Sequence, residues 1–148
     1  MLFATHMLIF IEGWLNLVNN SVQVSEGANG LRILYTFLFI LIFNPLAMFL
    51  FYRGYAGLCR DKSYLSLFIY LQPIAIILWL AFSIINFLGF NGFIRVADLY
   101  NKGYSAAGTL SLIESLIFLG EALLGSFVYY KICGIRSSLA SKLAPRLL

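Results

Sequence analysis

Charged residues are scarce in this chain. Only 11% of its 148 residues are charged, whereas 61% are hydrophobic and 17% aromatic, and the mean hydropathy is +0.91. A soluble domain of this length has no interior large enough for so much apolar surface. Residues 33–52 and 63–94 contain no charged side chain, and a spanning helix needs about 20 apolar residues. The sequence therefore predicts an integral membrane protein.

Histidine and cysteine are also rare, which excludes several kinds of chemistry. The single histidine, His6, rules out bis-histidine haem ligation within the chain, and two cysteines define no disulfide framework. The sequence has no Gly-rich phosphate loop, no Ser/His/Asp arrangement and no Cys/His cluster. We therefore expect no enzymatic activity, no metal and no cofactor. The net charge of +4 points to membrane topology and not to a nucleic-acid partner.

Lysine and arginine are missing from the first 31 residues. A secretory signal begins with a basic region, so we expect the first apolar segment to be retained as a helix. Apolar runs and turn signals predict an all-α polytopic protein, one membrane domain containing a bundle of four transmembrane helices at residues 2–18, 31–51, 64–88 and 108–130. Residues 19–30 are predicted to be an external loop, and residues 93–107 a turn or short amphipathic piece at the membrane interface.

The basic residues are distributed unequally between the two predicted sides of the membrane. The loop 52–63 and the tail 131–148 together carry seven Lys and Arg residues, and the opposite side carries three. Because cytoplasmic loops hold an excess of basic residues, we expect this loop and both termini in the cytosol. The loop would present Arg53, Arg60 and Lys62 to anionic phospholipids, at about 1 kcal/mol each, with Phe51, Tyr52 and Tyr55 as aromatic anchors at headgroup level.

Several short motifs resemble the secretory carrier membrane proteins (SCAMPs), four-span proteins of post-Golgi and recycling vesicles. Phe43-Asn44-Pro45 falls where that family has Phe-Thr-Pro. Phe51-Tyr52-Arg53-Gly54 stands where it has Trp-Tyr-Arg-Pro, and Arg60-Asp61-Lys62-Ser63 closes the segment. Gly89-Phe90-Asn91-Gly92 resembles its Gly-Phe turn after the third span. Leu50 and Gly54 stand where the family has Cys and Pro, and we expect a four-span core without the long N-terminal region and its Asn-Pro-Phe motifs.

This resemblance implies a role in vesicle trafficking at Golgi, endosomal or recycling-vesicle membranes. The segment between the second and third spans would engage acidic phospholipids or trafficking machinery. An alternative is an accessory structural subunit of a large membrane complex of respiratory or ATPase type, in an organelle inner membrane. A third hypothesis, a tetraspan protein that conducts protons or cations, rests on intramembrane carboxyl groups.

Those carboxyl groups lie in two predicted spans. Glu114 and Glu121 are seven residues apart and share a helix face, and Glu12 lies in the first span. A charged carboxylate at mid-membrane costs on the order of 3 kcal/mol, so we expect them inside the bundle with polar partners such as Asn44 and Asn86. Two interpretations stay open: a proton or cation pathway, or polar contacts that hold helices or a partner subunit together.

The small residues of the last span, among them Gly120, Gly125 and Ser126, favour close helix packing within the chain, by self-association or with other membrane proteins. Cys59 and Cys133 are predicted to lie next to the membrane on the cytosolic side. Such positions suit reversible palmitoylation. An unmodified interfacial thiol is the alternative.

Overall fold

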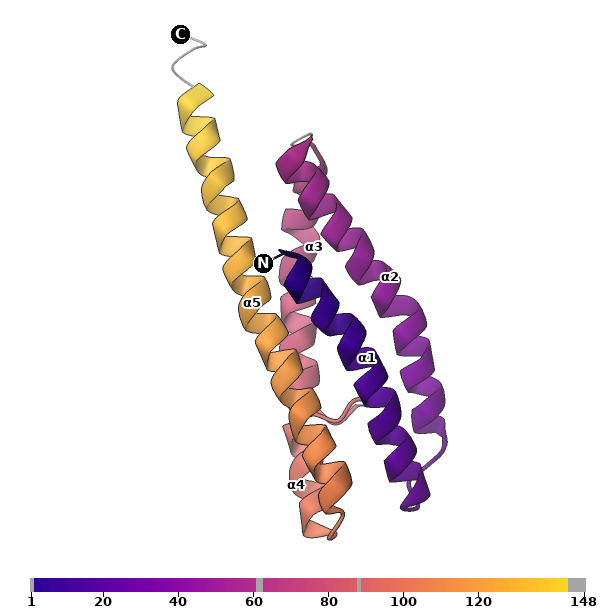
Figure 1. Ribbon diagram of the computed structural model, residues 1–148. Coiled ribbons are helices and arrows are strands. Elements are labelled where there is room, and N and C mark those ends of the chain that lie inside the picture. Colours follow the sequence, from indigo (N-terminus) through magenta and orange to yellow (C-terminus); the bar gives the residue numbers. More distant parts are fainter. Residues whose placement is uncertain (1, 61–62, 88, 144–148) are drawn as a thin grey trace.

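The computed structural model describes residues 2–60, 63–87 and 89–143, and the side chains of residues 7–60, 63–87 and 89–135. In this part, the chain forms five α-helices (Figure 1). They are α1 (Leu2–Ser25), α2 (Leu31–Cys59), α3 (Ser63–Ile84), α4 (Phe93–Asn101) and α5 (Ser105–Leu143). The described part of the chain therefore belongs to the all-α class, as predicted.

The four longer helices form a closed ring in the order α1, α2, α3 and α5. Each of them packs against two neighbours, and the short α4 packs mainly against α5. Successive long helices run in opposite directions, so the α2–α3 turn and the end of α5 lie at one end of the bundle (Figure 1). We call this the hairpin end. The opposite end, with the α1–α2 turn, residues 85–92 and α4, is called the α4 end.

Three helices of the described chain are long and apolar enough to cross a membrane: α2, α3 and α5 as far as Ile135. The prediction of four such helices is therefore wrong by this measure, because α1 does not qualify. The physical reason is that α1 carries one polar stripe of five side chains. These are all completely or almost completely buried: Glu12, Asn16, Asn19, Asn20 and Gln23.

Helices also occupy segments that the sequence predicted as loops. α1 continues to Ser25, through half of the predicted loop 19–30, and α2 continues to Cys59, so most of the predicted loop 52–63 is helical. α5 extends to Leu143 into the predicted tail, and α3 ends at Ile84, before the predicted residue 88. Lys62, a predicted lipid ligand, lies outside the described residues. α1, α2 and α5 were predicted too short because polar residues were interpreted as helix ends, although a helix can continue past the hydrocarbon layer of the membrane.

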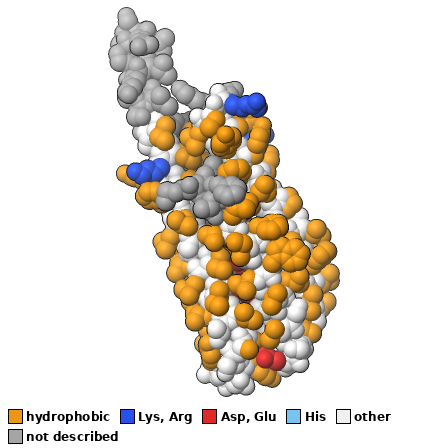
Figure 2. All heavy atoms as spheres, viewed as in Figure 1, with side chains coloured by type: hydrophobic (Ala, Val, Ile, Leu, Met, Phe, Trp, Pro, Cys, Tyr) orange, Lys and Arg blue, Asp and Glu red, His pale blue; other side chains and the backbone are white. Residues whose placement is uncertain are grey.

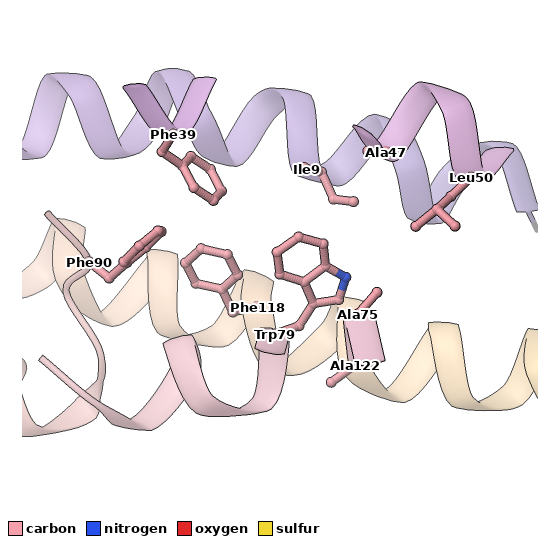
Figure 3. Close-up of a cluster of buried hydrophobic side chains, with 9 residues drawn as sticks. All are labelled: Ile9, Phe39, Ala47, Leu50, Ala75, Trp79, Phe90, Phe118 and Ala122. Carbon is pink, nitrogen blue, oxygen red and sulfur yellow. The ribbon is translucent and has the colours of Figure 1, made fainter. Parts of the chain in front are cut away.

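Aromatic rings fill the centre of the bundle. Phe39, Trp79, Phe90 and Phe118 come from α2, α3, the α3–α4 connection and α5, and Figure 3 shows their rings gathered between the helices. The rings of Phe39 and Phe90 meet edge to face at 4.7 Å between centroids. Such pairs contribute beyond their buried area. This aromatic layer packs α2, α3 and α5 against one another, and Ile9 of α1 belongs to the same buried cluster.

Residues 89–92 of the α3–α4 connection are buried although they are not helical. A Cβ on Gly92 would stand 2.5 Å from the carbonyl carbon of Ile84, and one on Gly89 would stand 2.9 Å from Thr36 Oγ1. Only glycine allows the backbone to approach so closely. Non-helical backbone at membrane depth requires partners within the protein, and the polar residues around this segment supply them.

The surface of the bundle is apolar along most of its length. Figure 2 shows hydrophobic side chains over the middle, basic side chains toward the hairpin end, and a carboxylate at the α4 end. The exposed faces of α2 and α3 carry large residues such as Ile42, Met48, Ile74 and Ile77. Exposed apolar surface of this extent indicates a lipid environment. We therefore describe the chain as a multi-pass membrane protein.

Candidate functional site

The hairpin end presents cationic and aromatic side chains from the last two turns of α2. Tyr52 and Tyr55 are about half exposed, at 50% and 55%, and Arg60 is exposed at the helix end. The Arg53 guanidinium lies 5.0 Å from the ring centroids of both Phe49 and Tyr64. These cation–π contacts hold Arg53 against the first turn of α3. A guanidinium that stacks on aromatic rings can still donate hydrogen bonds to an anion in its own plane.

The two helices of the hairpin meet at very close range. A Cβ on Gly57 would stand 2.9 Å from the backbone nitrogen of Leu65, so the small residue permits a short turn. Leu65 also packs in one cluster with Val128 and Ile132 of α5, which places Lys131 and Cys133 near the hairpin. Cys59 is exposed and Cys133 half-buried, and both are free thiols. Both cysteines are thus at the hairpin end, while their palmitoylation stays a prediction.

A buried hydrogen-bond network occupies the interior near the α4 end, and Asn91 is its centre. Arg32 Nη2 donates to Asn91 Oδ1 at 2.6 Å, and Gln23 Nε2 donates to the same oxygen at 2.8 Å. Asn91 Nδ2 donates to Glu114 Oε2 at 2.9 Å, and Asn19 donates to Glu114 Oε1 at 2.6 Å. One connecting residue therefore joins α1, α2 and α5 through hydrogen bonds.

Asn20 forms the second centre of this network. Its Nδ2 donates to Thr36 Oγ1 at 2.7 Å and to the carbonyl oxygen of Gly89 at 2.7 Å, and Arg32 Nε donates to its Oδ1 at 3.0 Å. The bond to Gly89 satisfies a backbone carbonyl that has no helical partner. The network therefore supports the non-helical residues 89–92 inside the bundle.

The basic residues of the α4 end are occupied by partners within the protein. Arg95 donates to Gln23 Oε1 at 2.9 Å and to Asp98 at 2.5 Å, and Lys102 Nζ lies 3.0 Å from Asp98 Oδ1. The hydrogen bond from Lys102 is the main cause that lowers the pKa of Asp98. Arg32 is bonded into the buried network. These three cations are therefore already bonded to partners within the protein, whereas Arg60 is exposed at the hairpin end.

The predicted intramembrane polar residues fall into three groups. Glu114 belongs to the network, whereas Glu12, Asn44 and Glu121 are buried closer to the hairpin end and have oxygen atoms without a hydrogen-bond partner in the described structure. Asn86 is exposed in the residues after α3. Its assignment to the bundle interior is wrong, because α3 ends two residues earlier and residues 84–87 are exposed.

Sequence reasoning did not predict most members of the network. The missed residues contribute amide, hydroxyl or guanidinium groups: Asn19, Asn20, Gln23, Arg32, Thr36, Asn91, Arg95, Ser111 and Ser115. One signal was present in the sequence, since residues 12, 16, 19, 20 and 23 recur at helical spacing. That spacing indicates a buried polar stripe rather than a helix end at residue 18.

Comparisons with known proteins identify no relative of this chain. No protein-family model, no curated protein and no solved structure matches it. Its functional interpretation therefore rests on its own residues and geometry.

Proposed function

We propose that the protein is a non-enzymatic membrane protein of vesicle traffic, and that its hairpin end binds anionic phospholipid headgroups on the cytosolic face. The observation that carries this proposal is the difference between the two ends of the bundle. Arg60 is exposed and Arg53 is held between rings beside exposed Tyr52 and Tyr55. At the α4 end, Arg32, Arg95 and Lys102 already have partners within the protein.

The proposal includes a fourth membrane crossing by α1. Its 24 residues span about 36 Å at 1.5 Å per residue, which exceeds the ~30 Å hydrocarbon layer. Phe10, Ile11, Trp14 and Val18 of α1 are each about half exposed. An apolar outer face with a polar inner stripe suits a helix that has lipid on one side and a polar interior on the other.

The trafficking part of the proposal rests on the resemblance to the secretory carrier membrane proteins. The quoted motifs lie at a helix proline, at the hairpin end and at the two close backbone approaches. Pro45 lies inside α2, and the segment from Phe51 to Arg60 forms the hairpin end. Gly89 and Gly92 allow the close backbone approach of the α3–α4 connection. Location of a tagged copy tests this part, because Golgi or endosomal puncta support it and mitochondrial staining supports the complex-subunit alternative.

Lipid selectivity tests the hairpin end directly. The full-length protein is reconstituted with spin-labelled phosphatidylserine or phosphatidylcholine, and the motionally restricted fraction of each lipid is measured. Each surface cation contributes about 1 kcal/mol, so Arg53→Gln and Arg60→Gln should each lower the preference for the anionic lipid by up to about fivefold. Added salt should weaken the preference as well.

Two control variants separate charge from packing. Arg53→Lys keeps the positive charge while changing the stacked guanidinium, so the preference should persist. Lys102→Gln removes a cation that is paired with Asp98 at the α4 end, and we expect little change. Equal association of the wild-type protein with the two lipids would refute the lipid-binding role.

A further inference from the structure

Two carboxyl groups in the bundle interior are buried without any partner. Glu12 of α1 is fully buried and Glu121 of α5 is 1% exposed. All four of their oxygen atoms lack a hydrogen-bond partner among the described residues. Glu114 provides the contrast within the same chain, because Asn19 and Asn91 donate to its two oxygens. Unsatisfied buried polar atoms of native proteins call for a specific explanation.

A small cavity lies beside Glu121. Its volume is about 10 Å³, and it is lined by Glu121 and Gln72 together with apolar residues that include Ile9 and Trp79. Figure 3 shows Ile9 and Trp79 facing each other across this part of the core. Gln72 is 4% exposed and its Oε1 has no partner in the described structure. A space of this size is close to that of one water molecule or one small ion.

The unpartnered atoms in this region are predominantly hydrogen-bond acceptors. Carboxylate oxygens and amide oxygens attract a proton or a hard metal ion, and they repel each other when nothing lies between them. Ile9, which lies three residues before Glu12 and on the same face of α1, lines the cavity beside Glu121. Glu12 therefore lies next to this cavity, where it interacts electrostatically with Glu114 and, to a smaller extent, with Glu121. Asn44, whose Oδ1 is also unpartnered, lies beside Gly13, the residue that follows Glu12.

Charged groups on the surrounding helices do not neutralise this pair within the described structure. α3 contributes Gln72 and Ser83 and contains no charged residue, and α2 contributes Asn44. Arg32 is engaged with Asn20 and Asn91, Arg95 of α4 is bonded to Gln23, and Lys102, directly after α4, is paired with Asp98. Phe118 lies between Glu114 and Glu121 along the same face of α5, and its ring stacks on Trp79 at 6.2 Å between centroids.

We propose that Glu12, Glu121 and Gln72 form a buried site that holds one exchangeable positive charge, a proton or a small monovalent metal ion. This site is independent of lipid binding at the hairpin end. The occupant satisfies oxygen atoms of α1, α3 and α5 at once and so stabilises the contact between these helices. Its presence makes helix packing respond to pH or to the cation that is supplied.

Infrared difference spectroscopy of the reconstituted full-length protein tests the site without requiring a reagent to reach it. The buffer is changed from about pH 9 to about pH 5, a range that spans ordinary and raised carboxyl titrations. The C=O band of protonated carboxyl groups is then recorded. We expect a band that Glu12→Gln and Glu121→Gln each reduce, and that Glu26→Gln, which changes a half-buried carboxyl group of the α1–α2 turn, leaves in place.

A second arm identifies the occupant. At constant pH, sodium chloride is compared with the chloride of a large organic cation. Conversion of the protonated band into carboxylate bands by sodium supports a metal ion, and no effect of sodium supports a proton. Gln72→Leu should shift the midpoint of the pH titration, whereas a role in packing alone leaves that midpoint unchanged.

The result that overturns the proposal does not depend on the folding of any variant. A wild-type protein whose carboxyl bands respond neither to pH nor to sodium has no exchangeable charge in its interior. A pH-dependent band that persists in both Glu12→Gln and Glu121→Gln also overturns the assignment.

Discussion

Replacing Asn91 tests the buried network most directly, because this side chain makes three hydrogen bonds of 2.9 Å or less to Arg32, Gln23 and Glu114. Hydrogen bonds to charged groups contribute about 1.5–3 kcal/mol in soluble proteins, whereas those between membrane helices average about 0.6 kcal/mol. Three bonds on the lower scale give about 2 kcal/mol. Arg32 and Glu114 stay in the interior after the change, so we expect Asn91→Ala to lower the free energy of unfolding by about 3 kcal/mol.

Steric trapping of the protein in bicelles measures this free energy under conditions where the bundle unfolds reversibly. Asn86→Ala is the matched control, since it removes the same side chain from the same connection at an exposed position. Exposed substitutions usually change stability by no more than about 0.5 kcal/mol. If Asn91→Ala and Asn86→Ala destabilise the protein equally, the network does not hold the bundle together.

Two further predictions concern backbone packing and pH. Gly92→Ala should lower the unfolding free energy by about 1–3 kcal/mol, because its Cβ would stand 2.5 Å from the carbonyl carbon of Ile84. Gly120→Ala is the control, since no neighbouring atom lies within 4 Å of a Cβ at that position. In the same steric-trapping assay this control should be neutral or stabilising. The lowered pKa of Asp98 means that its carboxylate stabilises the folded state above the ordinary aspartate pKa of about 3.9 and loses this effect as the pH falls through the lower folded value. The wild-type protein should therefore unfold at a higher temperature than Asp98→Asn at about pH 6, and this difference should disappear in stronger acid. A difference in unfolding temperature that does not change with pH would contradict the Asp98–Lys102 interaction.

The apolar runs predicted α2, α3 and α5 because their signal is an average over many residues. The uncharged stretch 33–52 lies within α2 and makes up most of it, and the uncharged stretch 63–94 contains all of α3 and the break that follows it. The helix ends were predicted less well, since Arg53 and Arg60 were interpreted as the start of a loop. In the structure Arg53 remains on the helix and stacks on Phe49 and Tyr64, a tertiary contact that no local pattern encodes.

The buried network around Asn91 was not predicted, because its hydrogen bonds join residues that lie far apart in the sequence. Asn91 lies 59 positions from Arg32 and 23 from Glu114, and nothing in the residues next to it marks it as buried. Asn86, five residues earlier, has the same chemistry and is exposed. What distinguishes them is the close backbone approach at Gly89 and Gly92, which turns residues 89–92 into the bundle. The polar stripe of α1 was the one part of this site that helical spacing could have revealed.

Membrane sidedness tests the central claim, that the hairpin end of a multi-pass bundle faces the cytosol. A membrane-impermeant maleimide is applied to cells whose plasma membrane alone has been permeabilised, using a variant in which Cys133→Ala leaves Cys59 as the only thiol. Cys59 is exposed at the hairpin end, so we predict that it is labelled under these conditions. A second variant tests the α4 end: it combines Cys133→Ala, Cys59→Ser and Lys102→Cys, so that position 102 carries the only thiol. This thiol should react only after the internal membranes are opened. Labelling of the position 102 variant without that step, with Cys59 protected, would contradict the account.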